Sequence, residues 1–345
     1  MLFDDKQPEE GIMVKRWLEV IRTCNLPDDL TMEEADPVSR WLVITRACVF
    51  SMTAISGLIG GLLALSRGPV NWWFWLVALI GILLAHASNN MINDYFDYRS
   101  GSDQAEDYPR GLYSPHPIRS GWLTPTKLMN AIIVVNVIDL AIAIYLTAMV
   151  GWGILIFAVL GFLISLFYVA EPIQLKYRGL GELGVFFIWG PLMIGGVYFA
   201  VSGYAPAWVF AASIPYGLTV TTVLIGKHID KLAPDAKNEV HTLPVFLGEQ
   251  QSLFLNKILF VLFHIIVVIL VLTRTLGPWV LLSLFALPKL INETWPRYSE
   301  PRPEEKPEGY PVWPLWFVSW AFRYNRTAGG LFVLGLILNL LLPIA

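Results

Sequence analysis

Charged residues are scarce in this chain. They make up 15% of its 345 residues, against about 25% in an average soluble domain. Hydrophobic residues reach 55% and the mean hydropathy is +0.57. A soluble fold of this length could not cover so much apolar surface with so few polar side chains. The scarcity of charge therefore excludes a soluble enzyme and a disordered protein, and it indicates an integral membrane protein with many spans.

Cysteine is scarce, and positive charges are not in excess. The two cysteines, Cys24 and Cys48, are too few for a disulfide framework or a cysteine-based metal cluster, and we expect unremarkable thiols. Asp and Glu (27) outnumber Lys and Arg (24), so nothing suggests nucleic-acid binding. The polar first 40 residues have no cationic stretch ahead of an apolar core, so we expect no cleaved signal peptide.

Long apolar runs are abundant. A helix needs about 20 apolar residues to cross the hydrocarbon layer of a bilayer, and nine segments meet this requirement. The sequence therefore predicts an all-α, polytopic membrane protein with nine transmembrane helices. The eighth segment is the weakest because Pro288 and Lys289 interrupt it. The nine predicted spans are residues 42–66, 71–92, 128–149, 152–170, 182–202, 206–226, 252–273, 277–295 and 328–344.

Lys and Arg are distributed unequally between the two ends of these spans. The side with the N-terminal arm and the loops after spans 2, 4, 6 and 8 holds or flanks 22 of the 24, and the other side has only Arg67 and Arg274. Basic loops remain in the cytoplasm. We therefore expect a plasma-membrane protein whose N-terminus and long polar loops are cytoplasmic.

Four regions follow from these assignments. Residues 1–40 form a cytoplasmic arm, in which 11–22 is amphipathic and suits the membrane surface. Residues 41–297 hold the first eight spans. Residues 298–327 are rich in Pro and then Trp, which suits an interfacial loop. Residues 328–345 form the ninth span.

A first acidic cluster ends the second span. Asn90, Asp94 and Asp97 are spaced i, i+4 and i+7, so they share one helix face, and Asn93 lies one turn before Asp97. Asp103 follows a few residues later. Ionisable side chains at the edge of a membrane span are costly to place there and are functional candidates by default.

A second cluster, Lys227, His228, Asp230 and Asp235, follows the sixth span. Spans 2 and 6 run in the same direction, so both clusters face the cytoplasm, and their separation by four spans hints at a parallel internal repeat. Carboxylates with few histidines suit Mg²⁺, which is commonly held by one or two carboxylates together with substrate phosphates. Two facing clusters therefore suit Mg²⁺ ions on a diphosphate. Cations available to neutralise the remaining charge are Arg110, Arg119, Lys176, Arg178 and Lys227.

These motifs resemble those of the UbiA superfamily of membrane prenyltransferases. Asn93-x-x-x-Asp97 with Asp103, followed by the second acidic loop, carries the resemblance. The segment Lys-Tyr-Arg-Gly-Leu-Gly-Glu-Leu-Gly-Val at 176–185 is similar to the 1,4-dihydroxy-2-naphthoate polyprenyltransferase branch, as is the six-residue step from Asp97 to Asp103. The chain departs from the family pattern in the second motif, where Asp230 and Asp235 are five residues apart instead of four.

The resemblance implies a nine-helix bundle that transfers an isoprenyl chain from a prenyl diphosphate to an aromatic acceptor. It implies 1,4-dihydroxy-2-naphthoate as the acceptor, in menaquinone biosynthesis, and two Mg²⁺ ions. Asp94, Asp97 and Asp103 would bind one ion, and Asp230 and Asp235 the other. Asp97, Asp230 and Lys227 would be catalytic. The substrate-binding residues would be Asn90, Asn93, Arg110, Arg119, Lys176, Tyr177, Arg178 and His228, and Tyr95, Tyr168 or Tyr177 would stabilise a carbocation.

Other functions stay open at this point. The acceptor could instead be a hydroxybenzoate, homogentisate, a tetrapyrrole precursor or glycerol phosphate. Intramembrane Asp and Asn side chains with a parallel repeat are also compatible with a transporter. A catalytically inactive accessory subunit is disfavoured because both acidic clusters are intact. The sequence specifies no oligomeric state.

Overall fold

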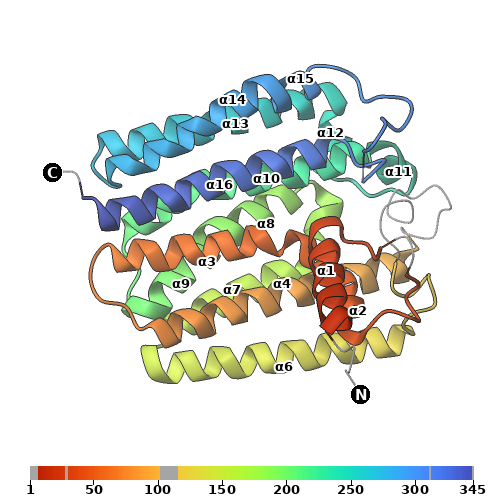
Figure 1. Cartoon of the computed structure of the whole chain (residues 1–345), viewed down its shortest axis with the longest axis horizontal. Coiled ribbons are helices and arrows are strands. Elements are labelled where there is room, and N and C mark those ends of the chain that lie inside the picture. Colours follow the sequence, from red (N-terminus) through yellow and green to blue (C-terminus); the bar gives the residue numbers. More distant parts are fainter. Residues whose placement is uncertain (1–6, 28–29, 102–115, 311, 344–345) are drawn as a thin grey trace, which may run out of the picture.

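The computed structural model describes residues 7–27, 30–101, 116–310 and 312–343. Its long helices lie side by side with their axes close to parallel (Figure 1). No β-strand occurs in the described part of the chain, so the all-α class is confirmed. Helices satisfy their own backbone hydrogen bonds, which is what a chain in lipid requires.

The long helices account for most of the bundle. They are α3 (Phe50–Leu65), α4 (Trp72–Ser100), α6 (Pro125–Val150), α7 (Gly153–Phe167), α10 (Ala207–Asp230), α13 (Glu249–Leu272) and α16 (Phe317–Leu341). Between α7 and α10 runs a continuous rod of α8 (Gly181–Phe187), a π-helical segment (Ile188–Leu192) and α9 (Met193–Ser202). The short helices are α1 (Gln7–Thr23), α2 (Pro37–Ile44), α11 (Leu232–Lys237), α12 (Leu243–Leu247), α14 (Leu287–Lys289) and α15 (Trp295–Arg297).

Six helical segments in the described residues are long and apolar enough to cross a membrane. They are Ala47–Leu65, Trp72–Ser100, Pro125–Val150, Gly181–Ser202, Ala207–Asp230 and Glu249–Leu272. The predicted fourth span corresponds to α7, a shorter apolar helix of 15 residues. Six spans are therefore evident from length and composition, and the predicted total of nine is not confirmed.

The last two predicted spans differ from a simple apolar helix. The segment predicted at 277–295 becomes a 3₁₀ helix (Pro278–Ala286), α14, a π-helical segment (Leu290–Thr294) and α15. Proline lacks an amide hydrogen and disrupts a regular helix, and Pro288 and Pro296 lie in this stretch. The segment predicted at 328–344 forms only the later part of α16, which already begins at Phe317.

Helix α10 lies at the centre of the bundle and α6 at its edge. Of the apolar stretch of α10, 72% is buried, against 17% for α6 and 33% for α13. Apolar side chains such as Val134, Val137 and Ile144 are more than half exposed on α6. Exposed apolar surface of this extent suits contact with lipid rather than water. The chain is therefore an integral membrane protein with α10 shielded from the lipid.

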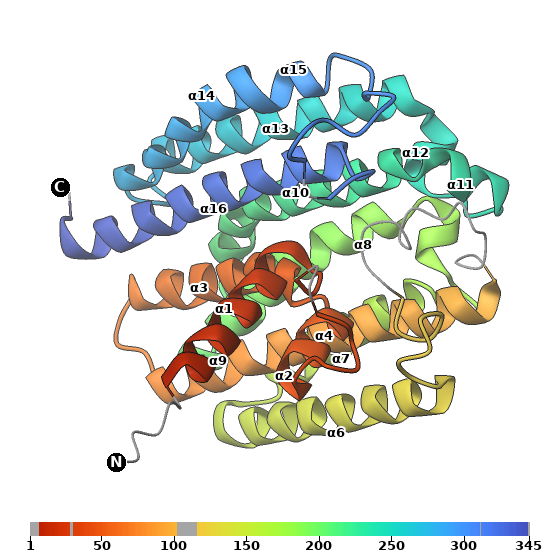
Figure 2. The same ribbon diagram turned by 45° about the vertical axis from the view of Figure 1, so that its right-hand side comes forward.

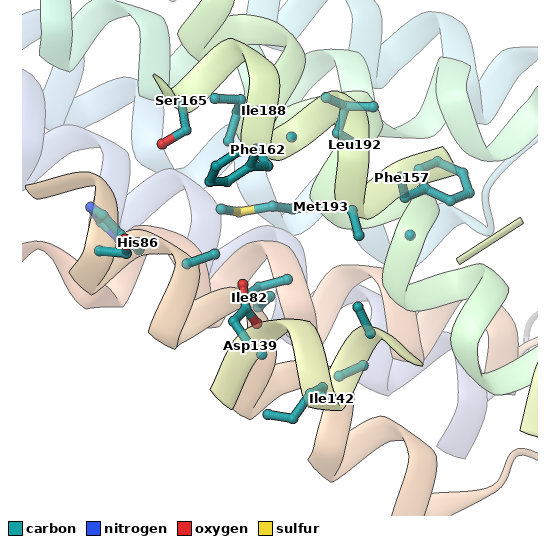
Figure 3. Close-up of a pocket in the computed structure, with 18 of the residues that line it drawn as sticks. Ile82, His86, Asp139, Ile142, Phe157, Phe162, Ser165, Ile188, Leu192 and Met193 are labelled. Carbon is teal, nitrogen blue, oxygen red and sulfur yellow. The ribbon is translucent and has the colours of Figure 1, made fainter. Parts of the chain in front are cut away.

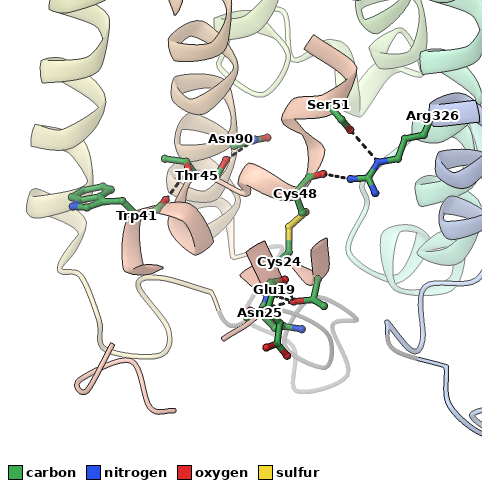
Figure 4. The surroundings of a disulfide bond; sticks show 10 residues. Glu19, Cys24, Asn25, Trp41, Thr45, Cys48, Ser51, Asn90 and Arg326 are labelled. Carbon is green, nitrogen blue, oxygen red and sulfur yellow. Dashed lines mark hydrogen bonds between the residues drawn. A yellow bond between two sulfur atoms is a disulfide. The ribbon is translucent and has the colours of Figure 1, made fainter. Parts of the chain in front are cut away.

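The sequence predicted that the two cysteines remain thiols, and this prediction is wrong. Cys24, just after α1, and Cys48, in the 3₁₀ turn Ala47–Val49 before α3, form a disulfide with a Cα–Cα distance of 5.2 Å (Figure 4). The bond became possible because the turn between α2 and α3 folds back beside the end of α1, an approach that the sequence does not reveal. The disulfide fastens α1, which contains the amphipathic segment 11–22, to the beginning of α3.

The close approach of α16 to the segment Pro278–Ala286 depends on a glycine. A Cβ atom added at Gly335 would lie 2.5 Å from the carbonyl oxygen of Trp279 and 2.5 Å from the Cα atom of Val280. These are backbone atoms, so the neighbour cannot relieve the clash by rotating a side chain. A Cβ at Gly330, on the same helix, has no atom within 4 Å.

We predict that Gly335→Ala destabilises the protein by about 1–3 kcal/mol through overpacking. The matched control Gly330→Ala is expected to be neutral or stabilising by up to about 1 kcal/mol, because alanine favours the helix. Thermal unfolding of the purified protein in detergent measures both. Equal unfolding midpoints for the two variants would show that α16 does not pack against the segment Pro278–Ala286 at Gly335.

Candidate active site

The two acidic clusters lie at the same end of the bundle. Asp94 and Asp97 occupy the last two turns of α4, and Asp230 ends α10 immediately before α11, which carries Asp235. Both helices end on the side where α11 and α12 are located (Figures 1 and 2). All four carboxylates are at least 95% buried. The structure therefore gathers carboxylates that are more than 130 residues apart in the sequence.

The carboxylates of α4 are held by cations from two other segments. Arg46 forms an ion pair with Asp94. The Nζ of Lys176, on the 3₁₀ turn Leu175–Arg178, donates to both oxygens of Asp97 at 2.7 and 2.9 Å. Burial alone would favour the neutral amine of Lys176, but the Asp97 carboxylate together with Tyr177, Asp235 and Tyr168 raises the pKa of Lys176 above its ordinary value. Lys176 is therefore cationic, and the carboxylate of Asp235 also contributes to the field around it.

Asp230 stabilises the beginning of the last helix. Its Oδ1 accepts from the backbone N–H of Phe317 at 2.9 Å, and its Oδ2 from that of Val318 at 3.0 Å. A carboxylate in this position satisfies helix N–H groups that have no partner within the helix and complements the helix dipole. One turn earlier on α10, a Cβ at Gly226 would lie 2.9 Å from the Val318 nitrogen. The second acidic cluster thus joins α10 to α16, and this long-range cap explains why α16 begins at Phe317.

Asp235 differs from the other three carboxylates. It is fully buried, and neither of its oxygens accepts a hydrogen bond in the described structure. The Nζ of Lys231 lies 3.4 Å from its Oδ1 as an ion-pair partner. The Oδ1 of Asn93 is likewise buried without a hydrogen bond. Unpartnered oxygens of this kind are the ligands that Mg²⁺ takes in proteins.

The donor set therefore fits a divalent cation in part. Among the residues described, no three His, Cys, Asp or Glu side chains are grouped closely enough to hold a metal ion by themselves. A bound ion would need ligands from a substrate as well, which is the usual situation for Mg²⁺ on phosphates. Asp103, the predicted third ligand of the first cluster, lies outside the described residues.

The other predicted residues are spread over the surroundings. The Nδ1 of His228 lies 2.6 Å from the Oε1 of Glu182, and both side chains are buried. Asn90 donates to the carbonyl oxygen of Thr45 at 2.9 Å, and Lys227 is half-buried on α10.

The remaining three described candidates are half-buried (Tyr177) or exposed (Arg119 and Arg178). Tyr177 lies 3.3 Å from the hydroxyl of Ser100. Arg178 is exposed and donates to the carbonyl oxygen of Pro172, and Arg119 is also exposed. Arg110 is outside the described residues.

An apolar cavity extends from this end of the bundle along α4. Its empty space, counted together with the part that opens to the outside, is about 1030 Å³. Its walls come from α4, α6, α7 and the rod of α8 and α9. Asn89 and Ser165, hydrogen-bonded to each other at 2.7 Å, line its polar end. Ile82, Phe162 and Met193 are among the side chains that line it further along (Figure 3). The cavity therefore suits a long apolar ligand.

Three residues at the acidic clusters or in the cavity were not identified from the sequence. Arg46 lies near the N-terminal end of the first predicted span, and its pairing with Asp94 involves residues 48 positions apart. Glu182 belongs to the segment 176–185 but was not singled out as a partner of His228. Asp139 is a lone carboxylate in an apolar run, which is itself a signal of function, and it lines the cavity.

We predict that Asp97 and Lys176 are energetically coupled. Asp97→Asn or Lys176→Met alone is expected to cost about 3–5 kcal/mol, because each leaves one buried charge unpaired. The double variant should be more stable than either single one, since no unpaired charge remains. Thermal unfolding in a chelator-containing buffer gives the four midpoints. Additive losses in the double variant would contradict the ion pair.

Comparison with known proteins places the chain in a family. The model of the UbiA prenyltransferase family matches residues 53–324. The 1,4-dihydroxy-2-naphthoate octaprenyltransferase of Bacillus subtilis (strain 168) is 24% identical over 235 residues, covering 68% of this chain and 74% of that protein. The UbiA prenyltransferase domain-containing protein 1 of Dictyostelium discoideum is 25% identical over 232 residues, covering 63% of this chain and 66% of that protein.

Solved structures agree at the level of the fold. A UbiA homolog from Archaeoglobus fulgidus bound to GPP and Mg²⁺ aligns with a TM-score of 0.58 at 13% identity, covering 85% of this chain and 99% of that one. The apo UbiA homolog from Aeropyrum pernix K1 aligns with a TM-score of 0.60 at 17% identity, covering 84% and 97%. The family match, the all-helical fold and the paired acidic clusters together show that this chain belongs to the UbiA prenyltransferase family and is a membrane-embedded transferase.

Proposed function

We propose that this protein transfers an isoprenyl chain from a prenyl diphosphate to an aromatic acceptor, with 1,4-dihydroxy-2-naphthoate as the acceptor. The observation that carries the proposal is the gathering of two acidic clusters and their cations at one end of the bundle. An apolar cavity lies beside them, and its last lining residue on α4, Ile92, comes two residues before Asp94. Two relatives support it: the B. subtilis protein is named for this acceptor, and the A. fulgidus homolog was solved with GPP and Mg²⁺.

The carboxylates would serve a metal-bound diphosphate. Asp94, Asp97 and Asp103 would hold one Mg²⁺ ion, and Asp230 and Asp235 a second, with Asn93 as a further oxygen donor. Bound Mg²⁺ supplies charge stabilisation to the leaving diphosphate. Arg46, Lys176 and Lys227 would donate hydrogen bonds to diphosphate oxygens, because an arginine fork and a lysine ammonium both bind such oxygens strongly.

The cavity would hold the apolar part of the donor and exclude water. The bond between the first prenyl carbon and the diphosphate oxygen breaks, the diphosphate leaves with the electron pair, and an allylic cation remains. An electron-rich carbon of the acceptor ring attacks this cation, and the ring then regains its aromaticity by losing the proton at that carbon to water. Tyr168 is the best placed of the candidate aromatic residues, because the charges of Lys176, Asp97 and Asp235 all act on its half-buried side chain. Its ring face would stabilise the cation.

The function is tested with purified protein, 1,4-dihydroxy-2-naphthoate, a series of prenyl diphosphates and Mg²⁺, with and without chelator. We expect prenylated product by mass spectrometry only when Mg²⁺ is present. Tight Mg²⁺-dependent binding of the diphosphate without product would direct the search to the other acceptors. If neither binding nor product is observed, prenyl transfer is refuted, and transport or an accessory role is favoured.

Asp235→Asn is the sharpest variant for this assay. It removes a buried charge that accepts no hydrogen bond, whereas changing Asp230 would also uncap α16. We expect the rate of transfer to fall by at least about a hundredfold, as for other losses of charge stabilisation at a reacting centre. Glu300→Gln, at an exposed carboxylate, is the matched control. Full activity of Asp235→Asn would refute a metal role for the second cluster.

We further propose nine spans, with α7, the segment Pro278–Arg297 and α16 in addition to the six evident ones, in the plasma membrane with the N-terminus in the cytoplasm. Single cysteines introduced at Ser66 and Lys237, on opposite sides of this arrangement, test the orientation. A membrane-impermeant maleimide is expected to label intact cells at position 66, and to reach position 237 only after permeabilisation. The unsubstituted protein, whose two cysteines form a disulfide, is the control. The reverse pattern would invert the topology.

A further inference from the structure

One carboxyl group lies within the apolar cavity. Asp139 is near the middle of α6 and lines the cavity, on the wall that also holds Ile82 and Ile142 (Figure 3). In the described structure no hydrogen bond or ion pair engages its side chain, and the residue is half-buried. A carboxyl group without a partner at membrane depth is costly.

The other polar side chains that line the cavity are all paired. Asn136 donates to Ser88 at 2.6 Å, Ser165 donates to Asn89 at 2.7 Å, and His86 lies 2.7 Å from the Thr53 hydroxyl. Asp139 therefore differs from them in facing the empty space with its hydrogen-bonding capacity unused.

Asp139 lies at a defined depth below the acidic clusters. It faces Gly81 of α4: a Cβ atom added at Gly81 would be 3.3 Å from its Oδ1. Gly81 lies thirteen residues before Asp94 on α4, which corresponds to about 20 Å at 1.5 Å per residue. An isoprene unit adds four carbon–carbon bonds of about 1.5 Å each, so an extended chain advances about 5 Å per unit. The fourth unit of a chain that starts at the diphosphate would reach the level of Asp139.

The free energy of a prenyl chain changes little when it enters the cavity, because lipid tails are as apolar as the cavity wall. The carboxyl group of Asp139, in contrast, must lose its water when a chain fills the space beside it. A small desolvation penalty at Asp139 therefore decides which chain lengths bind well. Chains that end at or before the level of Asp139 avoid the penalty, and chains that extend past it incur it.

We propose that Asp139 sets the length of the prenyl chain that the cavity accepts and that it favours donors of up to four isoprene units. This inference rests on the proposed prenyl transfer and names the donor class for the same site. Asp139 acts here as a specificity-determining residue and takes no part in breaking or forming bonds, since it lies about 20 Å from the carboxylates along α4.

The test compares geranylgeranyl diphosphate, with four units, and solanesyl diphosphate, with nine, as donors to the full-length protein. The measured quantity is the ratio of kcat/KM for solanesyl to that for geranylgeranyl diphosphate. We expect Asp139→Leu to raise this ratio by about tenfold or more, where tenfold corresponds to about 1.4 kcal/mol. The change should appear in KM for the long donor and not in kcat. Asp139→Asn should give a smaller increase, because its amide is polar but uncharged.

Two further variants control for packing. Gly81→Ala narrows the cavity at the level of Asp139 and is expected to lower the ratio. Ile144→Leu, on the exposed face of the same helix and outside the cavity, should leave it unchanged. A ratio that is the same in the unsubstituted protein and in Asp139→Leu would overturn the inference while leaving prenyl transfer intact.

Binding gives a second readout that does not need turnover. We expect geranylgeranyl diphosphate with Mg²⁺ to raise the Tm of the unsubstituted protein more than solanesyl diphosphate does, and Asp139→Leu to reduce this difference. Equal Tm shifts in the unsubstituted protein would overturn the inference even if the acceptor proves to be another compound. If neither donor binds or reacts with any variant, the proposed function and this inference both fail.

Discussion

The site depends on the neutralisation of buried carboxylates at the end of α4. Asp94 and Asp97 lie where a charged group is too costly to stand alone, and Arg46 and Lys176 supply the opposite charge. These two pairs also connect α4 to the turn before α3 and to the turn before α8. The same contacts that hold the helix ends together therefore place cations where a diphosphate would need them.

The second acidic cluster has a structural role that is inseparable from its position. Asp230 caps α16, and Gly226 lets the beginning of α16 lie directly against α10. Because α10 is the most buried of the evident spans, its end is well fixed, and Asp235 follows it within five residues. Asp230 therefore serves the packing of the last helix, while neither oxygen of Asp235 accepts a hydrogen bond in the described structure.

The acidic motifs were accessible from spacing alone, since Asn90, Asp94 and Asp97 repeat with the period of one helix face. The cations that pair with these carboxylates could not be predicted from spacing. Arg46 meets Asp94, and Lys176 meets Asp97, across 48 and 79 residues of chain. Hydropathy likewise found every apolar segment, but it did not find the true beginning of α16, because the cap comes from Asp230 and not from a neighbouring residue. The disulfide between Cys24 and Cys48 was not predicted either, because it also joins two segments that only the tertiary structure brings together.

The sequence by itself determined that this is a helical membrane protein with two acidic motifs at the same end of their helices. It did so because apolar run length and residue spacing are local properties of the chain. Only the tertiary structure decided which cation neutralises which carboxylate, that α16 is capped from α10, and that Asp139 lines the cavity instead of facing lipid. Those outcomes depend on how helices are rotated and packed against one another, which no local pattern specifies.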